Sequence, residues 1–582
     1  MTASLKKRGQ KIIRRFSRAS IKASEEGKEH IKENFIDRLS HVKNIKLLIF
    51  EWSLLILTLI TLSIAQAFWF GNSYSENVFV AGGTYTEGTI GKVNSMNPLF
   101  ATTSSEKTLS RLLFATLVTT DYSGHLGAGL AKEPVSQDDG HIWIIELKEG
   151  LKWSDGEPIT VDDVMFTISL IQNPNVDSIY SPSLKSVRVT QNQANKITFT
   201  LPADYADFES VLTIPVVPKH ILENADPKVL IEHDFSTNPV GSGAFMFKTT
   251  QTFGGTTSTM VSDEKLIYLS ANPNYYLGKP MLNTFAVHTF NDKAELIENI
   301  NNGTITATAD LSPTDEEEIT LPQIYKRESG INSGIFAIFN MDNVKNREVR
   351  AAIRLGLDKG ALTTIAPNNT VIDYPLLQSQ IELNNYPAMP AQDFQTAFNK
   401  VTELSGENPI NLSVVTVNSG LLPKIAENVT EQLKNLGFNA HLATYEESPE
   451  FISSTIAKRG YDILIYEIEL GSDPDLLPYY HSSQANESGL NLSNYRNLLV
   501  DDFLLAARKT LDKDMRIKKY ESFLESWATD IPAIALFKSN ITYYYNKNVR
   551  TFSDNTRLIT PLDRFSDVHT WMVSKEARNR TP

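Results

Sequence analysis

The chain has 582 residues, of which 41% are hydrophobic and 21% are charged, and its formal net charge is −13. A chain of this length can bury more than one hydrophobic core and normally divides into domains. The acidic balance argues against nucleic acid as a partner for the bulk of the protein, and the absence of cysteine excludes disulfides, thiolate metal sites, thiol nucleophiles and a lipid-modified cysteine anchor.

An apolar run lies near the N-terminus, at residues 47–70, and Glu51 is its only charged residue. At about 1.5 Å per helical residue, this run is long enough to cross a hydrocarbon core of about 30 Å. Residues 1–46 are rich in Lys and Arg, whereas the residues directly after the run are uncharged. The positive-inside rule therefore predicts a single-pass protein of the cell membrane, with a basic cytoplasmic tail at 1–46, a transmembrane helix in contact with lipid at 47–70, and an extracytoplasmic main domain.

Two other interpretations of this N-terminal region stay open. A cleaved signal peptide would use a possible Ala-Gln-Ala site at residues 65–67, but its basic region would span about 46 residues and its apolar region would exceed the usual 7–15. Residues 20–46 alternate charged and apolar side chains. That pattern is typical either of an amphipathic helix on anionic lipid or of a solvated helix.

Short segments after the apolar run alternate between strand and helix patterns. Residues 79–85 predict a strand that ends at Tyr85, and residues 142–147 predict another. Residues 187–189 and 197–201 predict two further short strands. These segments indicate mixed α/β construction.

Residues 147–168 combine the end of a strand, a tight turn and the start of a helix. Asp155, followed by glycine, favours a turn, because glycine tolerates positive φ and aspartate can bind its own backbone. Thr160 is a natural N-cap, and Asp162 and Asp163 place negative charge at the positive end of the helix dipole. Catalytic roles for these three carboxylates are the alternative, but turn formation and capping account for all of them.

A resemblance to the family 5 extracellular solute-binding proteins, the oligopeptide, dipeptide and nickel receptors of ABC importers, is carried by residues 147–167. They read LKEGLKWSDGEPITVDDVMFT, and the family pattern is similar to LRkGvkWhDGxpltAdDVxfT. Two loops also resemble family elements: PVGSGAF at 239–245, whose glycines suit a turn or a close backbone approach, and NPNYYLGKP at 272–280. The resemblance covers roughly residues 78–570.

The later half of the chain predicts a second α/β region. Residues 335–340 form a nearly continuous apolar run, the pattern of a strand that is buried on both faces. Residues 412–417, 425–436 and 438–442 predict a strand, a helix closed by Gly437 and a second strand, which is a βαβ unit with parallel pairing. A third strand at 461–466, helices at 503–511 and 515–527, and a return strand at 530–537 complete this region.

The resemblance implies an α/β, two-lobed, periplasmic-binding-protein-like fold, type II, of the large peptide-receptor cluster. We expect a first lobe with an inserted subdomain at 71–335, a second lobe at 336–537, and a return to the first lobe with a C-terminal tail at 538–582. The two crossings between the lobes would act as a hinge.

The loop at residues 467–475 is the predicted binding site, because ligands of open α/β sheets bind outside the carboxyl ends of strands. Peptide-binding members of the family place an acidic residue at the position of Leu470, where it pairs with the ligand's ammonium group. Glu469 or Asp473 would then replace it, or the ligand has no free amino terminus here, or Leu470 favours an apolar ligand; alternatively, the acids only start a helix at Pro474. The expected ligand-binding residues are Glu469, Asp473, Tyr466, Leu470, Asn491, Tyr495 and Tyr85.

The resemblance further implies a membrane-anchored, extracytoplasmic substrate-binding component of an ABC importer. Such a component would capture peptides, which we expect to be oligopeptides, and deliver them to permease subunits. It implies no enzyme activity and no cofactor, and the ten scattered histidines, without an H-x-x-x-H pair, predict no metal site. A ligand sensor and an envelope hydrolase with the same fold are the alternatives. We expect Glu469→Ala or Asp473→Ala to weaken ligand binding at a cost in stability of no more than about 1 kcal/mol, as is usual for surface loops.

Overall fold

The computed structural model describes residues 46–73, 75–253, 264–366, 368–446 and 448–579. The chain forms two compact units, one with residues 1–78 and 576–582 and the other with residues 79–575. Residues 1–45, which include nearly all of the predicted cytoplasmic tail, lie outside the described residues.

The predicted apolar helix is present as α3 (Lys46–Ser73). Its window Ile49–Gln66 is long and apolar enough to cross a membrane, and none of that window is buried inside the protein. A signal sequence near the N-terminus has the same length and composition. The helix therefore fits both interpretations of this segment.

A mixed sheet of 11 strands runs through residues 79–575 of the described chain. Its order is β16-β15-β17-β13-β18-β12-β2-β11-β10-β9, and β14 pairs with β18. In chain order the strands are β2 (Thr84–Ile90), β9 (Phe245–Thr252), β10 (Lys265–Ala271), β11 (Thr284–Phe290), β12 (Ala307–Thr308), β13 (Ile324–Phe339), β14 (Thr370–Val371), β15 (Asn411–Val417), β16 (Asn439–Tyr445), β17 (Ile463–Glu469) and β18 (Ala533–Asn546).

Two large apolar clusters divide this unit into lobes. The first lobe contains the cluster drawn from residues 85–331 and 541–571, and the second lobe contains the cluster drawn from residues 335–537. The long strands β13 and β18 pair with each other and run from one cluster into the other. The predicted domain boundaries, 335/336 and 537/538, fall within these two strands.

The crossing strands change register where the clusters meet. Pairing of β13 with β18 is irregular between Gly330 and Gly334. The N-terminal half of β13 carries exposed and half-buried polar side chains, among them Lys326 and Glu328. Because only its apolar half stands out in the sequence, the strand is much longer than the predicted segment 335–340.

The predicted βαβ unit is confirmed in the second lobe. Strands β15 and β16 are parallel in register, and α13 (Leu422–Asn435) connects them. Helix α13 buries Ile425, Val429 and Leu433, and Gly437 has φ 98° directly after it. Strand β17 pairs with β15 in parallel, so that the carboxyl ends of all three strands lie at one edge. The long helices of this lobe are α10 (Arg347–Gly356), α12 (Phe394–Ser405), α16 (Leu498–Lys509) and α17 (Lys513–Asp530).

The first lobe begins differently from the prediction. Residues 79–85 do not form one strand, because the chain breaks at Gly82 and Gly83, which both have positive φ. Strand β1 (Ser75–Val80) precedes this break and β2 follows it. Helices α4 (Ser104–Leu113) and α9 (Lys293–Asn301) pack beside β2, as the contacts between these elements show.

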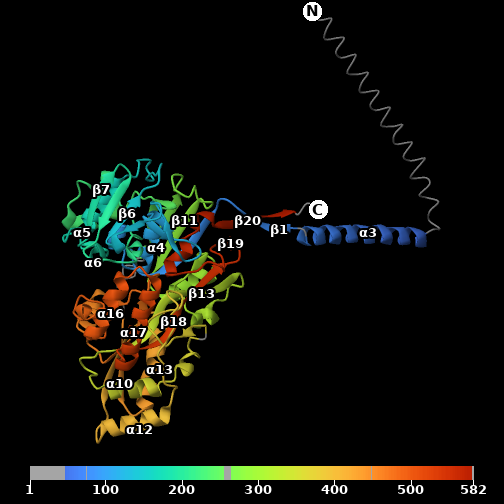
Figure 1. Cartoon of the computed structure of the whole chain (residues 1–582). Coiled ribbons are helices and arrows are strands. Elements are labelled where there is room, and N and C mark those ends of the chain that lie inside the picture. Colours follow the sequence, from blue (N-terminus) through green and yellow to red (C-terminus); the bar gives the residue numbers. More distant parts are fainter. Residues whose placement is uncertain (1–45, 74, 254–263, 367, 447, 580–582) are drawn as a thin grey trace, which may run out of the picture. The chain divides into compact units, whose positions relative to one another are not determined.

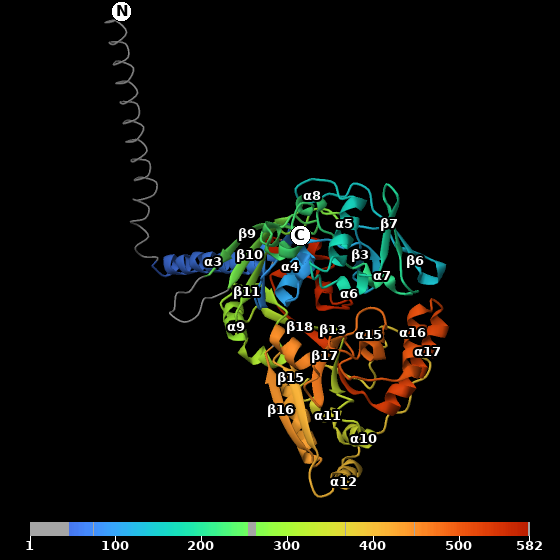
Figure 2. The same cartoon turned by 90° about the vertical axis from the view of Figure 1, so that its left-hand side faces the viewer.

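An inserted subdomain carries a second sheet, in the order β5-β6-β8-β7. Figures 1 and 2 both place this subdomain next to α16 and α17 of the second lobe. Its elements are β5 (Val135–Gln137), β6 (Ile142–Glu146), α5 (Val161–Gln172), α6 (Ser181–Leu184), β7 (Arg188–Gln193), β8 (Lys196–Thr200) and α7 (Phe208–Val211).

The predicted turn and cap are confirmed at the start of α5. The Asp155 carboxylate accepts the N–H of Glu157 at 3.1 Å, and the Asp163 carboxylate accepts the backbone N–H of Thr160 at 2.8 Å. The PVGSGAF loop makes the expected close backbone approach: a Cβ at Gly243 would lie 2.3 Å from the carbonyl oxygen of Leu112. The segment with the family resemblance thus defines the fold of the inserted subdomain.

Candidate functional site

The loop that follows β17 is fixed at the junction between the lobes. The N–H of Leu470 donates to the carbonyl of Asn332, at 2.8 Å. The Gln380 side-chain amide donates to the carbonyls of Leu470 and Asp473, both at 2.9 Å. These bonds give residues 470–473 a defined backbone path next to the crossing strands.

Asn332 connects this loop to both lobes. Its backbone N–H donates to the carbonyl of Ile559 in the first lobe at 2.8 Å, and its side-chain amide donates to the carbonyl of Gly471 at 3.0 Å. The Ser379 hydroxyl donates to its side-chain oxygen at 2.7 Å. Asn332 is fully enclosed, so this small residue of β13 links the predicted binding loop to the hinge.

Glu469 faces the first lobe. It is the last residue of β17, and its side chain is exposed. Removal from bulk water by the surrounding protein raises the pKa of its carboxyl; Lys107 opposes this effect, and Asp563 reinforces it. Both of these neighbours belong to the first lobe, so a solvent-accessible carboxylate of the second lobe lies within electrostatic reach of the opposite lobe.

Asp473 and Asp475 form a double ion pair within the second lobe. Asp473 accepts a hydrogen bond from Arg516 of α17 at 2.6 Å, and Asp475 accepts one from Nε of Arg508 of α16 at 3.1 Å. Only 6% of the Asp473 side chain and 14% of the Arg516 side chain are exposed. Burial raises the pKa of Asp473 to about 6, although Arg516 opposes the shift. Asp473 therefore lacks the exposed loop position that the sequence-based expectation assumed.

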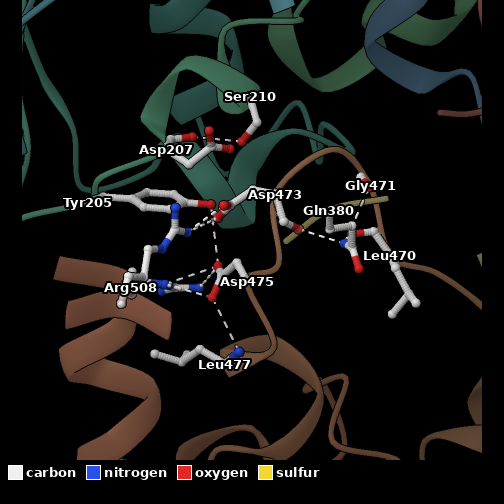
Figure 3. A network of polar contacts seen from close by, with 11 residues as sticks. Tyr205, Asp207, Ser210, Gln380, Leu470, Gly471, Asp473, Asp475, Leu477 and Arg508 are labelled. Atoms are coloured by element: carbon white, nitrogen blue, oxygen red, sulfur yellow. Dashed lines mark hydrogen bonds and ion pairs between the residues drawn. The ribbon is translucent and has the colours of Figure 1, made fainter. Parts of the chain in front are cut away.

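Residues 205–207 of the first lobe contact this double ion pair (Figure 3). The Tyr205 hydroxyl donates to the Asp475 carboxylate at 3.3 Å, and the N–H of Ala206 donates to the carbonyl of Arg508 at 2.8 Å. The Arg508 guanidinium also lies over the Tyr205 ring, 5.0 Å from its centre. The two lobes are therefore in direct contact here through side chains and backbone.

Two predicted ligand contacts on the same strand and loop belong to the second-lobe core. Leu470 is only 7% exposed and is part of the apolar cluster. Figure 3 shows its side chain pointing away from Asp475. Tyr466 is half-buried and packs against the same cluster. The usual position of the acidic anchor is thus occupied by a packing residue.

Asn491 and Tyr495 use their polar groups within the second lobe. The Asn491 amide donates to the carbonyls of His481 and Tyr495, at 3.1 and 2.8 Å. The Tyr495 hydroxyl donates to the Asp530 carboxylate at 2.5 Å. Both residues are buried. The two side chains therefore stabilise their own loop, the structure does not bring them together with Glu469, and their contact with a ligand stays a prediction.

Tyr85 is a core residue of the first lobe. Its side chain is 1% exposed, and its hydroxyl donates to the Glu87 carboxylate at 2.5 Å and contacts the Tyr543 hydroxyl. Glu87 in turn forms a buried ion pair with Arg564. Tyr85 is therefore a member of a buried polar network, and its contact with a ligand stays a prediction.

Several residues at the lobe junction could not be predicted from sequence patterns. They are Lys107, Tyr205, Asp207, Arg508 and Arg516. Each stands in a helix or loop where a single charged or aromatic residue is ordinary, and only the fold brings them to the loop after β17. Among the described residues, no group of three His or carboxylate side chains is arranged to hold a metal ion.

The sequence matches a known protein family and several of its characterised relatives. The model of the bacterial extracellular solute-binding proteins, family 5 Middle, matches residues 125–489. The oligopeptide-binding protein AppA of Bacillus subtilis is 24% identical over 487 residues, which are 79% of this chain and 87% of AppA.

Solved structures with the same fold include that of Bacillus subtilis AppA in complex with a nonapeptide, with a TM-score of 0.71 and 22% identity over 86% of this chain and 100% of the other. The ABC transporter substrate-binding protein CtaP of Listeria monocytogenes has a TM-score of 0.73 and 24% identity, covering 85% of this chain and 100% of its own. NikZ of Campylobacter jejuni, solved with Ni(L-His), has a TM-score of 0.71 and 21% identity, covering 84% and 99%.

Proposed function

Because the chain belongs to the bacterial extracellular solute-binding proteins of family 5, we propose that it is the membrane-anchored substrate-binding component of an ABC importer and that it captures peptides between its two lobes. Two observations support the transport role. The matched region spans parts of both lobes, and the fold is shared with an ABC transporter substrate-binding protein. The apolar helix α3 supports the anchor, which would keep the receptor near its permease.

The observation that carries the proposal is the position of Glu469 between the lobes. A carboxylate at the carboxyl end of a strand, crowded by protein yet open to solvent, suits a cationic group of a ligand better than it suits a structural partner. The ammonium group of a peptide supplies that charge. Its backbone can add strand-like hydrogen bonds, which give affinity without reading sequence.

Lobe closure explains how capture leads to delivery. The lobes are joined by β13 and β18 alone among the described long strands, so they can rotate about the irregular pairing near Asn332. A peptide that contacts both lobes stabilises the closed form, and the permease would recognise that form. Relatives named as oligopeptide-binding proteins favour peptides as the ligand class.

Glu469→Gln is expected to weaken peptide binding about tenfold, which corresponds to about 1.4 kcal/mol, because it removes the charge that pairs with the ligand's ammonium group. Calorimetric titration of the full-length protein with a panel of unmodified peptides, and with the same peptides acetylated at the amino terminus, measures this loss. Acetylation is expected to weaken binding to the unmodified protein and to change little in Glu469→Gln.

A matched control is Glu525→Gln, since Glu525 is an exposed carboxylate on α17 away from the strand ends. This variant should retain the affinity of the unmodified protein. Equal affinity of Glu469→Gln and Glu525→Gln would remove Glu469 from the binding site.

A further inference from the structure

More carboxylates than guanidinium groups meet where residues 205–207 contact the double ion pair. The carboxylates of Asp207, Asp473 and Asp475 meet the guanidinium groups of Arg508 and Arg516. Asp473 and Asp475 are each matched by one arginine of their own lobe. Asp207 comes from the first lobe and brings a third carboxylate to an already balanced site.

Asp207 is also incompletely satisfied. Within the described residues, its Oδ2 atom is buried without a hydrogen-bond partner, and so is Nε of Arg516 across the junction. The Ser210 hydroxyl donates a hydrogen bond to the backbone carbonyl of Asp207, at 2.8 Å. An ionised carboxylate that is buried in this way is costly, and protonation relieves the cost.

The groups that face Asp207 come from each neighbouring element. The loop after β17 presents Asp473, helix α17 presents Arg516, and its own segment presents Tyr205 and Glu209. Burial and the charge of Asp473 raise the pKa of the Asp207 carboxyl well above its usual range, although hydrogen bonding from Ser210 and the charge of Arg516 oppose them. Because Asp473 also has a raised pKa, the proton belongs to the pair and not to one carboxyl.

We propose that residues 205–207, together with the Asp473–Arg516 and Asp475–Arg508 ion pairs, form a proton-linked clasp that holds the two lobes closed. This inference rests on the proposed function, because the clasp would regulate closure of the same site between the lobes. Tyr205 and Ala206 supply the neutral contacts of the clasp, and Asp207 makes its strength depend on pH.

The direction of the pH dependence follows from the difference between the two states. In the open form, Asp207 leaves Asp473 and returns to water, where an aspartyl pKa is about 3.9. The closed form therefore binds more protons than the open form. Closure is favoured below the raised pKa of the clasp and is lost as pH rises through it, and the closed-to-open ratio changes by at most about tenfold per pH unit for one proton.

Fluorescence energy transfer within the full-length protein tests the clasp without any peptide. The chain has no cysteine, so Ala194→Cys and Thr402→Cys, both at exposed positions on different lobes, accept labels without a background. The transfer efficiency is expected to fall as pH rises from about 4.5 to 8.5, because the fraction of closed molecules decreases.

Three variants of the labelled protein decide the outcome. Asp207→Asn should remove the pH dependence, and Tyr205→Phe should lower the closed fraction at every pH but keep the slope. Asp204→Asn, on the same loop but paired with His141 at 3.3 Å, should behave like the parent protein. A pH-independent parent, or an Asp207→Asn variant with the parent's pH profile, would overturn the proposal.

The readout also separates the clasp from the proposed function. Because no peptide is added, a protein that binds no peptide can still show the pH-dependent clasp. Conversely, peptide binding together with pH-independent closure would reject the clasp alone.

Discussion

Arg564→Met is expected to lower the free energy of unfolding by about 3–5 kcal/mol, because it leaves the Glu87 carboxylate buried without a counter-charge. Nη2 of Arg564 lies 2.8 Å from the Glu87 carboxylate, and their side chains are 5% and 1% exposed. The Tyr85 hydroxyl cannot replace the lost charge, since it already donates to Glu87. Urea unfolding followed by circular dichroism measures the effect.

This ion pair matters for the whole first lobe because it joins distant parts of the chain. Glu87 is on β2, and Arg564 is in the short helix Pro561–Phe565 near the end of the chain. Lys132→Met is the matched control: Lys132 pairs with Glu146 on the surface of the same lobe, where loss of the pair should not change stability measurably. Equal stability of the two variants would contradict the importance of the buried pair.

Asp473→Ala is expected to cost about 3–5 kcal/mol as well, because Arg516 then remains buried in the second lobe without its carboxylate. This expectation replaces the loss of no more than about 1 kcal/mol that is usual for a surface loop. A downward shift of the urea midpoint with an unchanged slope would confirm it.

The double variant Asp473→Leu, Arg516→Met separates a lost ion pair from a general disturbance of the loop. Replacing both partners by apolar side chains removes the stranded charge, so most of the stability should return. A double variant that is no more stable than Asp473→Ala would show that the loop, and not the ion pair, sets the loss.

Local patterns predicted a large part of the fold. The βαβ unit of the second lobe and the capped helix after Asp155 depend on residues that are near each other in sequence. The polar half of β13 was missed because its side chains alternate charge without an apolar stripe. The break at Gly82 and Gly83 was missed because small residues also fit a strand end.

The site was harder to predict than the fold, because its partners are distant in sequence. The acids around Asp473 are visible as a cluster, but Arg516 lies 43 residues away and Tyr205 lies 270 residues from its partner Asp475. In the sequence, the arginines of α16 and α17 fit the pattern of an ordinary solvent-exposed helix face. Burial, which decides whether a carboxylate binds a ligand or an arginine, is a property of the assembled lobes.

The residues that the family resemblance indicated as ligand contacts differ in their exposure. Asn491, Tyr495 and Tyr85 belong to segments that resemble binding-side elements, yet their hydroxyl and amide groups are engaged inside the lobes. Glu469 differs from them in one physical respect. Its carboxylate is exposed and faces charges of the opposite lobe.

Mass spectrometry of the solute that is retained by the full-length protein tests the central proposal most directly. The protein is purified without added ligand, denatured, and its released small molecules are identified beside those released by Glu469→Gln. We predict that the unmodified protein releases peptides with free amino termini and that Glu469→Gln releases much less of them. A retained solute without peptide bonds, or equal amounts of peptide from both proteins, would contradict peptide capture through Glu469.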